Sequence, residues 1–526
     1  MILLIILTII LLSIILKRIY HKKRKVILQI GPSLKDKGGM VTVMQEIMDS
    51  ELSRKYKIIH IPTYISKKKF LLFFGSTFRI LWYKIIYRIE FSHIHMASYG
   101  SFYRKSILII LCRILNIKIL LHCHGACFEE FYNSLNEKKQ KYVKKIFNKC
   151  EKVIVLSESW KNFYSKFVEE DKIVIMYNSV HVPEKIERNT KKETIKGVFL
   201  GRIGERKGVY DIIDAVEKLS KENIRVEITI AGDGEVDKAK KLIKTKKLEK
   251  EIKILNWINK DEKDEILRKS DFFLLPSYNE GMPLSVLEAM SYSLPVITSK
   301  VGGIPEIVTM EKNGILVEPG DKEELEEAIR KIVLDEKLRN NLAEKAFETI
   351  NERFNLNSYI EKLEKIYKEI KRKNIKVCLT SSAGGHFMQL KQLFKMTQKY
   401  NTFILTEKNE ISKGCEKKYK MKFLMQQERK NITFIFEFIY NLLKNLGTIF
   451  INNPDVIIST GAGATAFSCL FTKIFGGKVI YIESFAKVNS KTITGKIVYS
   501  FADEFYVQWE EMKKLYPKAH YEGGIY

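Results

Sequence analysis

Two carboxylates in the stretch NEGMPLSVLEAM, Glu280 and Glu288, lie on either side of a Gly-x-Pro turn and the first turns of an expected helix. Two cations, Arg202 and Lys207, follow the strand-like run GVFLG upstream. Cations and a helix N-terminus suit a diphosphate, and carboxylates accept hydrogen bonds from the hydroxyls of ribose and sugar. A Glu-x7-Glu pair alone is usually a solvated helix face. Combined with the Gly-Arg-x4-Lys-Gly loop, it predicts a nucleotide diphosphate-sugar site and hence a sugar-transfer enzyme.

Strand-like apolar runs alternate with helical stretches along the chain, and this alternation predicts α/β units with parallel sheets. We place three such units at residues 26–190, 191–345 and 374–526. A helical segment at about 346–371 is expected to pack back on the first unit. In such sheets ligands bind at the carboxyl ends of the strands, where the glycine-containing loops of this sequence lie.

The composition favours anionic partners, because the formal net charge is +28. The basic residues are scattered through helical stretches, and neither zinc-finger spacing nor an RNA-binding aromatic signature accompanies them. Nucleic acid is therefore not expected as a partner. Attraction to a membrane surface explains the charge better.

The first sixteen residues carry no charge and precede the basic run KRIYHKKRK. Such a run spans about 24 Å as a helix, short of the ~30 Å hydrocarbon core, and Lys17 and Arg18 could snorkel to extend it. We predict an anchor helix at residues 1–20 that spans the cell membrane, and a monotopic helix in the interface is the alternative. The basic flank predicts that the catalytic body lies on the cytoplasmic face.

The seven cysteines include no CxxC pair, which fits reduced thiols. His122, Cys123, His124 and Cys127 are metal-ligand types at close spacing. However, His122 and His124 would share one face of a continuing strand while Cys123 faces away. We therefore predict a strand end followed by a glycine turn, and no metal site.

Residues 26 to about 371 resemble the family 4 retaining glycosyltransferases, which have the GT-B fold of two doubly wound Rossmann-like domains. The motifs that carry the resemblance are GGM, HG, GRIGERKG, AGDGE, SYNEGMPLSVLEAM and PVITSKVGGIPEIV. It implies an acceptor-side domain at 26–190 and a donor-binding domain at 191–345.

The resemblance also implies roles for individual residues. Glu280 would engage the donor sugar at the reaction centre, and His124 would contact the transferred sugar. The residues implied to bind the rest of the nucleotide-sugar are Gly39, Arg202, Lys207, Gly281, Met282, Pro283, Leu284 and Glu288. Asp233 in AGDGE fits turn chemistry, and Glu306 in GGIPE fits either a helix cap or a substrate contact.

No metal or other cofactor is expected for this part, because the sequence contains no Asp-x-Asp to bridge a metal and a diphosphate. Cations and a helix dipole can supply that stabilisation. The family resemblance implies that leaving and attacking groups lie on one face of the sugar.

The third unit carries glycine loops after strand-like runs, in SSAGGHFMQL and STGAGATAF, and a strand KVIYIE that ends at Glu483. It resembles the membrane-recruiting acceptor-half subunit of two-part N-acetylglucosaminyl- and β-glycosyltransferases, and the N-terminal half of MurG. The implied acceptor cleft comprises Gly384, Gly385, His386, Gly461, Gly463 and Glu483. His386 or Glu483 could act there as general base, and helix capping is the alternative for His386.

No donor half with its own nucleotide loop follows HYEGGIY. We therefore expect a separate donor-half glycosyltransferase subunit to dock on residues 374–526 for an inverting transfer. The apolar stretch ITFIFEFIYNLLKNLGTIFI predicts a helix that faces the membrane, the partner or the core.

We therefore expect a membrane-associated glycosyltransferase, and the anchor and the basic surface suit a polyprenyl-diphosphate-linked glycan acceptor. Retention of configuration and a place in capsule or exopolysaccharide synthesis are what the family resemblance implies. The alternative is a scaffold that anchors a partner transferase and contains an inactive family 4 domain. A soluble polymer synthase of similar fold is a third possibility.

Overall fold

The structure is a computed structural model that describes residues 26–64, 69–87, 89–185, 194–371, 375–426, 434–463 and 465–525. The anchor predicted at residues 1–20 lies outside these ranges. Within them, no helix combines the length and the apolar character needed to cross a membrane.

The first unit is a parallel sheet with strand order β2-β1-β3-β4-β5-β6. Its strands are β1 (Val26–Gly31), β2 (Lys57–Pro62), β3 (Ile89–Met96), β4 (Lys118–Cys123), β5 (Lys152–Val155) and β6 (Ile173–Ile175). The helices between them are α2 (Gly39–Asp49), α3 (Leu52–Lys55), α4 (Lys69–Ile86), α5 (Gly100–Ile114), α6 (Phe128–Asn133), α7 (Glu137–Phe147) and α8 (Glu158–Tyr164).

The second unit repeats this plan with strand order β12-β11-β10-β7-β8-β9. Its strands are β7 (Ile195–Leu200), β8 (Val226–Ala231), β9 (Ile252–Leu255), β10 (Phe272–Leu275), β11 (Val296–Ser299) and β12 (Gly314–Val317). Its helices are α9 (Val209–Lys221), α10 (Val236–Thr245), α11 (Lys260–Lys269), α12 (Leu284–Ser291), α13 (Lys322–Leu334) and α14 (Glu336–Arg353).

The third unit is a parallel sheet with strand order β15-β14-β13-β16-β17-β18-β19. Its strands are β13 (Lys376–Ser381), β14 (Asn401–Glu407), β15 (Met421–Leu424), β16 (Val456–Ser459), β17 (Lys478–Ile482), β18 (Glu504–Val507) and β19 (His520–Tyr521). Its helices are α16 (Gly385–Gln392), α17 (Met396–Lys399), α18 (Glu410–Lys413), α19 (Phe434–Asn452), α20 (Thr465–Ile474) and α21 (Ile493–Tyr499).

Each sheet has a point where the strand order reverses, and the predicted motifs lie there. The neighbouring strands at these points are β1 and β3, β7 and β10, and β13 and β16. Connections leave such neighbours toward opposite sides, which opens a crevice at their carboxyl ends. The loops with Gly39, with Arg202 and Lys207, and with Glu280 all border such crevices. The expectation of parallel α/β units is confirmed.

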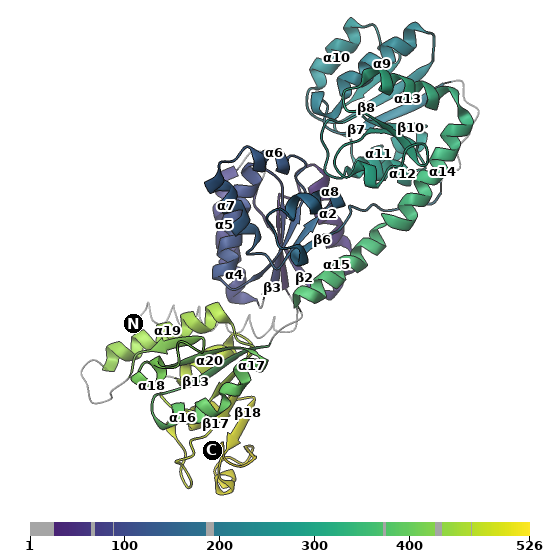
Figure 1. The fold of residues 1–526 in the computed structure, drawn as a ribbon. Helices are drawn as coiled ribbons and strands as arrows, with labels where there is room; N and C mark the ends of the chain where they lie inside the picture. Colours follow the sequence, from purple (N-terminus) through teal and green to yellow (C-terminus); the bar gives the residue numbers. More distant parts are fainter. Residues whose placement is uncertain are drawn as a thin grey trace, which may run out of the picture.

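The helix α15 (Leu356–Lys371) returns from the second unit to the first, as Figure 1 shows. The Tyr367 hydroxyl lies 2.9 Å from His93 Nδ1, and the Lys118 ammonium donates to the Ile370 carbonyl over 2.5 Å. The third unit touches the first through the Asn116 amide, which donates to the Asn452 carbonyl of α19 over 3.2 Å.

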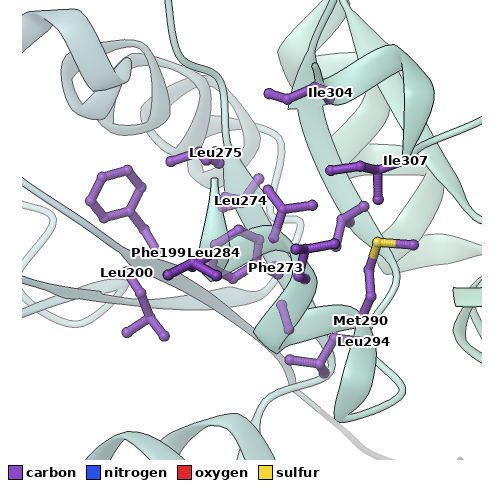
Figure 2. Close-up of a cluster of buried hydrophobic side chains, with 14 of the residues drawn as sticks. Phe199, Leu200, Phe273, Leu274, Leu275, Leu284, Met290, Leu294, Ile304 and Ile307 are labelled. Carbon is purple, nitrogen blue, oxygen red and sulfur yellow. The ribbon is translucent and has the colours of Figure 1, made fainter. Parts of the chain in front are cut away.

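Buried strands form the core of the second unit. All residues of β10, β11 and β12 are buried, as expected when helices cover both faces of a parallel sheet. Figure 2 shows side chains of β7 and β10 packed against Leu284 and Met290 of α12. This packing holds α12 in place beneath the loop that carries Glu280.

Candidate active site

Glu280 lies in the loop between β10 and α12, and its carboxylate is 6% exposed. It accepts a hydrogen bond from the Ser277 hydroxyl over 2.8 Å and forms an ion pair with Lys207. Gly302 and Gly303 pack against the backbone of this loop. Gly303 N donates to the Gly281 carbonyl over 2.7 Å. Gly302 has a φ of +56°, and a Cβ there would lie 1.9 Å from the Glu280 carbonyl oxygen, so only glycine fits.

Lys207 ends the short 3₁₀ helix η2 (Glu205–Lys207), directly after the loop that follows β7. At the next residue, Gly208, φ is +69° and a Cβ would lie 2.1 Å from the Pro276 carbonyl oxygen. The loops that follow β7 and β10 therefore touch. Arg206, which the sequence did not single out, donates to the Asn279 carbonyl over 2.8 Å.

Arg202 lies in the loop that follows β7 and is exposed, so its guanidinium can reach a ligand. The AGDG turn supports this loop from below, since a Cβ on Gly232 would lie 1.8 Å from the Gly201 carbonyl oxygen. Asp233 accepts from Ile203 N through its backbone carbonyl over 2.6 Å. That contact agrees with turn chemistry for Asp233.

Glu288 on α12 pairs with the Lys263 ammonium at 2.6 Å. Glu46, on α2 of the first unit, faces it. Burial and then the Glu288 carboxylate raise the pKa of Glu46 to about 8, against the opposing effect of Lys263. Glu46 Oε2 is buried without a hydrogen-bond partner. The sequence did not indicate Glu46, because an isolated glutamate on an amphipathic helix is an ordinary surface residue.

The first unit contacts the second unit through the residues predicted to meet the sugar. A Cβ on Gly39, the first residue of α2, would lie 3.4 Å from Leu284 Cδ1, and one on Gly281 would lie 3.7 Å from the His124 carbonyl oxygen. Met282 is held by Asn178, whose side-chain amide donates to its carbonyl over 2.7 Å. The structure therefore brings Gly39, His124 and the Glu280 loop to one boundary, and their roles toward substrate stay predictions.

Glu306 also crosses between the two units. Its carboxylate accepts from the backbone N–H groups of Glu158 and Ser159, over 2.9 and 3.2 Å, at the start of α8. Of the two readings of Glu306, this contact supports the helix cap.

A stack of imidazoles lies behind His124 on the face of the sheet covered by α15. The Nε2 of His124 lies 3.0 Å from Nδ1 of His95. The ring centroid of His122 lies 5.2 Å from that of His95 and 5.4 Å from that of His93. Burial lowers the pKa of each, so these rings are neutral at pH 7. Ring nitrogens of His93, His95 and His122 lie within 4.8 Å of one another. In the described part of the chain, this group could hold a metal ion. Cys123 faces the opposite core, as expected for alternating strand residues.

The third unit brings its predicted glycine loops together. His386 Nδ1 donates to the Thr460 carbonyl over 2.7 Å, and Ser382 N donates to the Gly461 carbonyl over 3.1 Å. Gly463 N donates to the Thr494 hydroxyl over 3.1 Å. A Cβ on Gly384 or Gly385 would meet no atom within 4 Å, so the start of α16 is open.

Glu483 differs from the other residues predicted for this cleft. It is 1% exposed, and its carboxylate accepts from Ser484 N, from the Thr492 hydroxyl and, over 2.7 Å, from the Tyr516 hydroxyl. These contacts tie the end of β17 to Thr492 and Tyr516, and a role of Glu483 as general base stays a prediction. Glu407, at the end of β14, was not indicated by the sequence. Burial raises its pKa, and it accepts from Ala383 N beside the glycine loop over 3.0 Å.

Comparison with known families assigns all three units. Residues 24–183 match the family described as Glycosyltransferase Family 4, and residues 182–349 match glycosyl transferases group 1. Residues 376–525 match the family described as oligosaccharide biosynthesis protein Alg14 like.

Individual relatives agree with this assignment. An uncharacterized glycosyltransferase of Methanocaldococcus jannaschii is 30% identical over 326 residues, which cover 61% of this chain and 88% of that protein. The UDP-Gal:alpha-D-GlcNAc-diphosphoundecaprenol alpha-1,3-galactosyltransferase of Escherichia coli is 27% identical and covers 54% of this chain and 77% of its own. The UDP-N-acetylglucosamine transferase subunit alg14 of Schizosaccharomyces pombe is 38% identical over 102 residues, which are 18% of this chain and 49% of that subunit.

Solved structures show the same fold. Sucrose-phosphate synthase from Thermosynechococcus elongatus superposes with a TM-score of 0.57 at 17% identity, over 66% of this chain and 99% of its own. Anabaena HepE in complex with UDP and glucose gives a TM-score of 0.54 at 16% identity, over 66% of this chain and 100% of its own. The predicted resemblance is confirmed: this chain belongs to the GT-B glycosyltransferases of group 1 and family 4, and it carries an Alg14-like domain as its third unit.

Proposed function

We propose that residues 26–371 transfer a sugar, with retention of configuration, from a nucleotide diphosphate-sugar to a lipid-linked glycan acceptor. The observation that carries this proposal is the meeting of Lys207 and Glu280 at one boundary with Gly39 and His124. Lys207 is a cation that suits a leaving diphosphate, and Glu280 is a buried carboxylate that suits a sugar. Both lie at the boundary with the first unit, from which an acceptor would approach.

The donor would lie across the switch point between β7 and β10. Arg202, Lys207 and the N-terminus of α12 would bind the diphosphate. Lys207 can keep Glu280 and still bind a phosphate oxygen, because an ammonium has three donors. Glu288, beside Lys263, would accept hydrogen bonds from the ribose hydroxyls.

In the transfer, the bond from the anomeric carbon to the phosphate oxygen breaks while the acceptor oxygen forms its bond on the same face. The acceptor hydroxyl proton goes to the leaving phosphate oxygen. Glu280 would stabilise the positive charge that develops on the sugar, and Arg202 and Lys207 would stabilise the negative charge on the leaving group. His124, neutral because of its burial, would orient the sugar by hydrogen bonding.

The name of the E. coli relative supports a diphosphate-linked lipid as acceptor. Polysaccharide synthesis, of capsule or exopolysaccharide, on the cytoplasmic face of the membrane fits that chemistry. The match to Alg14, named as a transferase subunit, supports a third unit that associates with the membrane and recruits a donor-half partner for an inverting transfer.

The test uses the full chain in detergent or nanodiscs, with a panel of nucleotide-sugars and polyprenyl-diphosphate-linked N-acetylglucosamine. Wild type should transfer one sugar, Glu280→Gln should not, and NMR of the product should show the anomeric configuration of the donor. An inverted product would contradict retention. If wild type and Glu280→Ala were equally inactive with every donor and acceptor, the alternative of a scaffold with an inactive family 4 domain would gain support.

A further inference from the structure

The first unit contains a buried lysine that has no anionic partner. Lys105, on α5, is 2% exposed, and its ammonium donates to the Thr63 hydroxyl over 2.5 Å. Thr63 in turn donates to the Gly31 carbonyl over 2.8 Å, so its oxygen is free to accept. Among the described residues, Arg104 is the charged group whose charge shifts the pKa of Lys105. Burial, and then the charge of Arg104, lower the pKa of Lys105 to about 7.

Two more buried polar groups lack partners, one next to Lys105 in the sequence and one in the loop after β3. The Nε of Arg104 and the Oγ of Ser98 are buried without a hydrogen bond, and the Arg104 guanidinium lies 5.1 Å from the centroid of the Tyr64 ring. Burial lowers the pKa of Arg104 as well. Buried cations are normally paired, because an uncompensated one costs several kcal/mol. This arrangement of adjacent cations therefore fits a site whose negative charge comes from a ligand.

The position of these groups is that of a substrate site. Thr63 follows β2, Ser98 follows β3, and both flank the switch point between β1 and β3. A Cβ on Gly125 would lie 2.5 Å from Ser98 Oγ, so the Ser98 loop touches the turn that carries His124. Neighbouring strands are about 4.8 Å apart. The strands before Thr63 and His124, β2 and β4, are separated in the sheet by β1 and β3, so the cations and the predicted position of the donor sugar lie at the same edge of the sheet.

Apolar surface adjoins the cations. Phe74 and Phe78 on α4 are 60% and 67% exposed, and Ile107 on α5 is 50% exposed. The two helices pack against each other, and they lie together on the outer side of the first unit in Figure 1. A pair of adjacent cations on the same helix as exposed apolar side chains matches an amphiphile with an anionic head and a hydrocarbon tail.

We propose that Lys105, Arg104, Thr63 and Ser98 form the subsite for the diphosphate of the lipid-linked acceptor, with its hydrocarbon chain along the exposed face of α4 and α5. This assignment deepens the proposed function and rests on it for the acceptor class. The Lys105 ammonium and the Arg104 guanidinium bind the phosphate oxygens. The acceptor sugar then extends past Ser98 toward Gly125 and the Glu280 loop.

The first experiment measures binding to the full chain of geranylgeranyl diphosphate, geranylgeranyl monophosphate and inorganic pyrophosphate. Wild type should bind the prenyl diphosphate most tightly. Lys105→Met should weaken it by about 10- to 100-fold, since a charge-assisted contact is lost, and should leave the affinity for UDP unchanged. Lys84→Met is the matched control, because Lys84 is also 2% exposed but lies in the last turn of α4. It should bind the prenyl diphosphate like wild type.

Unchanged prenyl diphosphate binding by Lys105→Met would overturn the subsite, as would pyrophosphate binding as tight as that of the lipid. Thermal unfolding separates misfolding from a binding defect, and Arg104→Gln, at a less buried position, gives a second variant with the same expected direction. In a transfer assay, an intact KM for the lipid acceptor in Lys105→Met would refute the subsite and leave the proposed function standing. Prenyl diphosphate binding through Lys105 without any sugar transfer by wild type would refute the function and leave the subsite standing.

Discussion

The crevices of the second and third units have the same backbone plan and different charges. In both, glycine-containing loops follow the strands at the point where the strand order reverses. The second unit places Arg202, Arg206 and Lys207 there, next to a buried carboxylate. The corresponding loops of the third unit, residues 382–386 and 460–463, contain no lysine or arginine. The fold provides an open crevice in each unit, and the side chains determine whether it can hold a diphosphate.

The largest expected effect is on the charged crevice. Glu280→Gln should reduce kcat for sugar transfer by on the order of 10²–10³-fold, because it removes the negative charge opposite the developing positive charge. The affinity for the nucleotide should change little, since Arg202 and Lys207 remain. Steady-state kinetics with labelled nucleotide-sugar measure both.

The control for this prediction is His386→Ala in the crevice of the third unit, which should leave transfer by residues 26–371 unchanged. If the two variants lowered kcat equally, the two crevices would act in one reaction, and the comparison between them would fail.

The next prediction compares one glycine from each crevice. At Gly302, φ is +56° and an added Cβ would lie 1.9 Å from the Glu280 carbonyl oxygen; at Gly384, φ is +74° and no atom lies within 4 Å. Gly302→Ala should therefore cost about 3 kcal/mol or more of unfolding free energy, from a clash added to strain. Gly384→Ala should cost about 1–3 kcal/mol from strain alone.

Chemical denaturation followed by circular dichroism measures both values, with Gly75→Ala on α4, where nothing lies within 4 Å, as the control for an unstrained glycine. Equal costs for Gly302→Ala and Gly384→Ala would show that the Glu280 loop yields to the added methyl group. The loop would then be less rigid than its contacts imply.

The features of these crevices that the sequence predicts are encoded in short, continuous stretches of the chain. Apolar runs separated by helical stretches specify parallel strands, and a glycine directly after such a run marks the loop, so the loops of Arg202, Glu280 and His386 could be placed in advance. The resemblance to known families then supplied roles that spacing alone does not. Burial of both sheet faces made the strand signals strong in all three units.

The residues that the sequence missed depend on contacts between distant segments. Glu46 acquires its environment only when α2 meets α12 across two units, and Glu407 only when β14 ends beside Ala383. Lys105 lies two residues after the exposed Tyr103, and it is buried when α5 packs against the sheet and the ammonium reaches Thr63 after β2. No local pattern distinguishes a lysine that becomes buried from one that stays in water.

A smaller effect is expected on the pH dependence of stability, through the carboxyl groups of Glu46 and Glu407. The pKa of Glu46 is raised to about 8, above the ordinary value of 4.5 that it has in the unfolded chain. Between these values the folded protein binds more protons than the unfolded one, so this group makes stability fall as pH rises from about 5 to about 8. Glu46→Gln should flatten that decline and raise the melting temperature at pH 8 more than at pH 5.

Glu407 offers the matched case in the third unit, since burial also raises its pKa while Ala383 N opposes the shift. Glu407→Gln should act in the same direction. Melting curves from pH 5 to 8.5 for both variants and wild type provide the measurement. A pH profile of Glu46→Gln that is parallel to wild type would mean that Glu46 is ionised in the fold beside Glu288.

The smallest expected effect separates a structural from a chemical role for His386. Its Nδ1 donates to the Thr460 carbonyl over 2.7 Å, and an asparagine amide can donate in a similar position. His386→Asn should therefore leave unfolding close to wild type, whereas His386→Ala should cost about 1 kcal/mol for the lost hydrogen bond. If a donor-half partner completes this crevice, both variants should remove the partner-dependent transfer equally, because both lack the Nε2 that would accept the acceptor proton. If instead His386→Asn retained partner-dependent transfer and only His386→Ala lost it, the imidazole would serve to tie the β13 loop to the β16 loop. Glu407, which accepts from Ala383 N in the β13 loop, and Glu483 would then be the candidates for the general base.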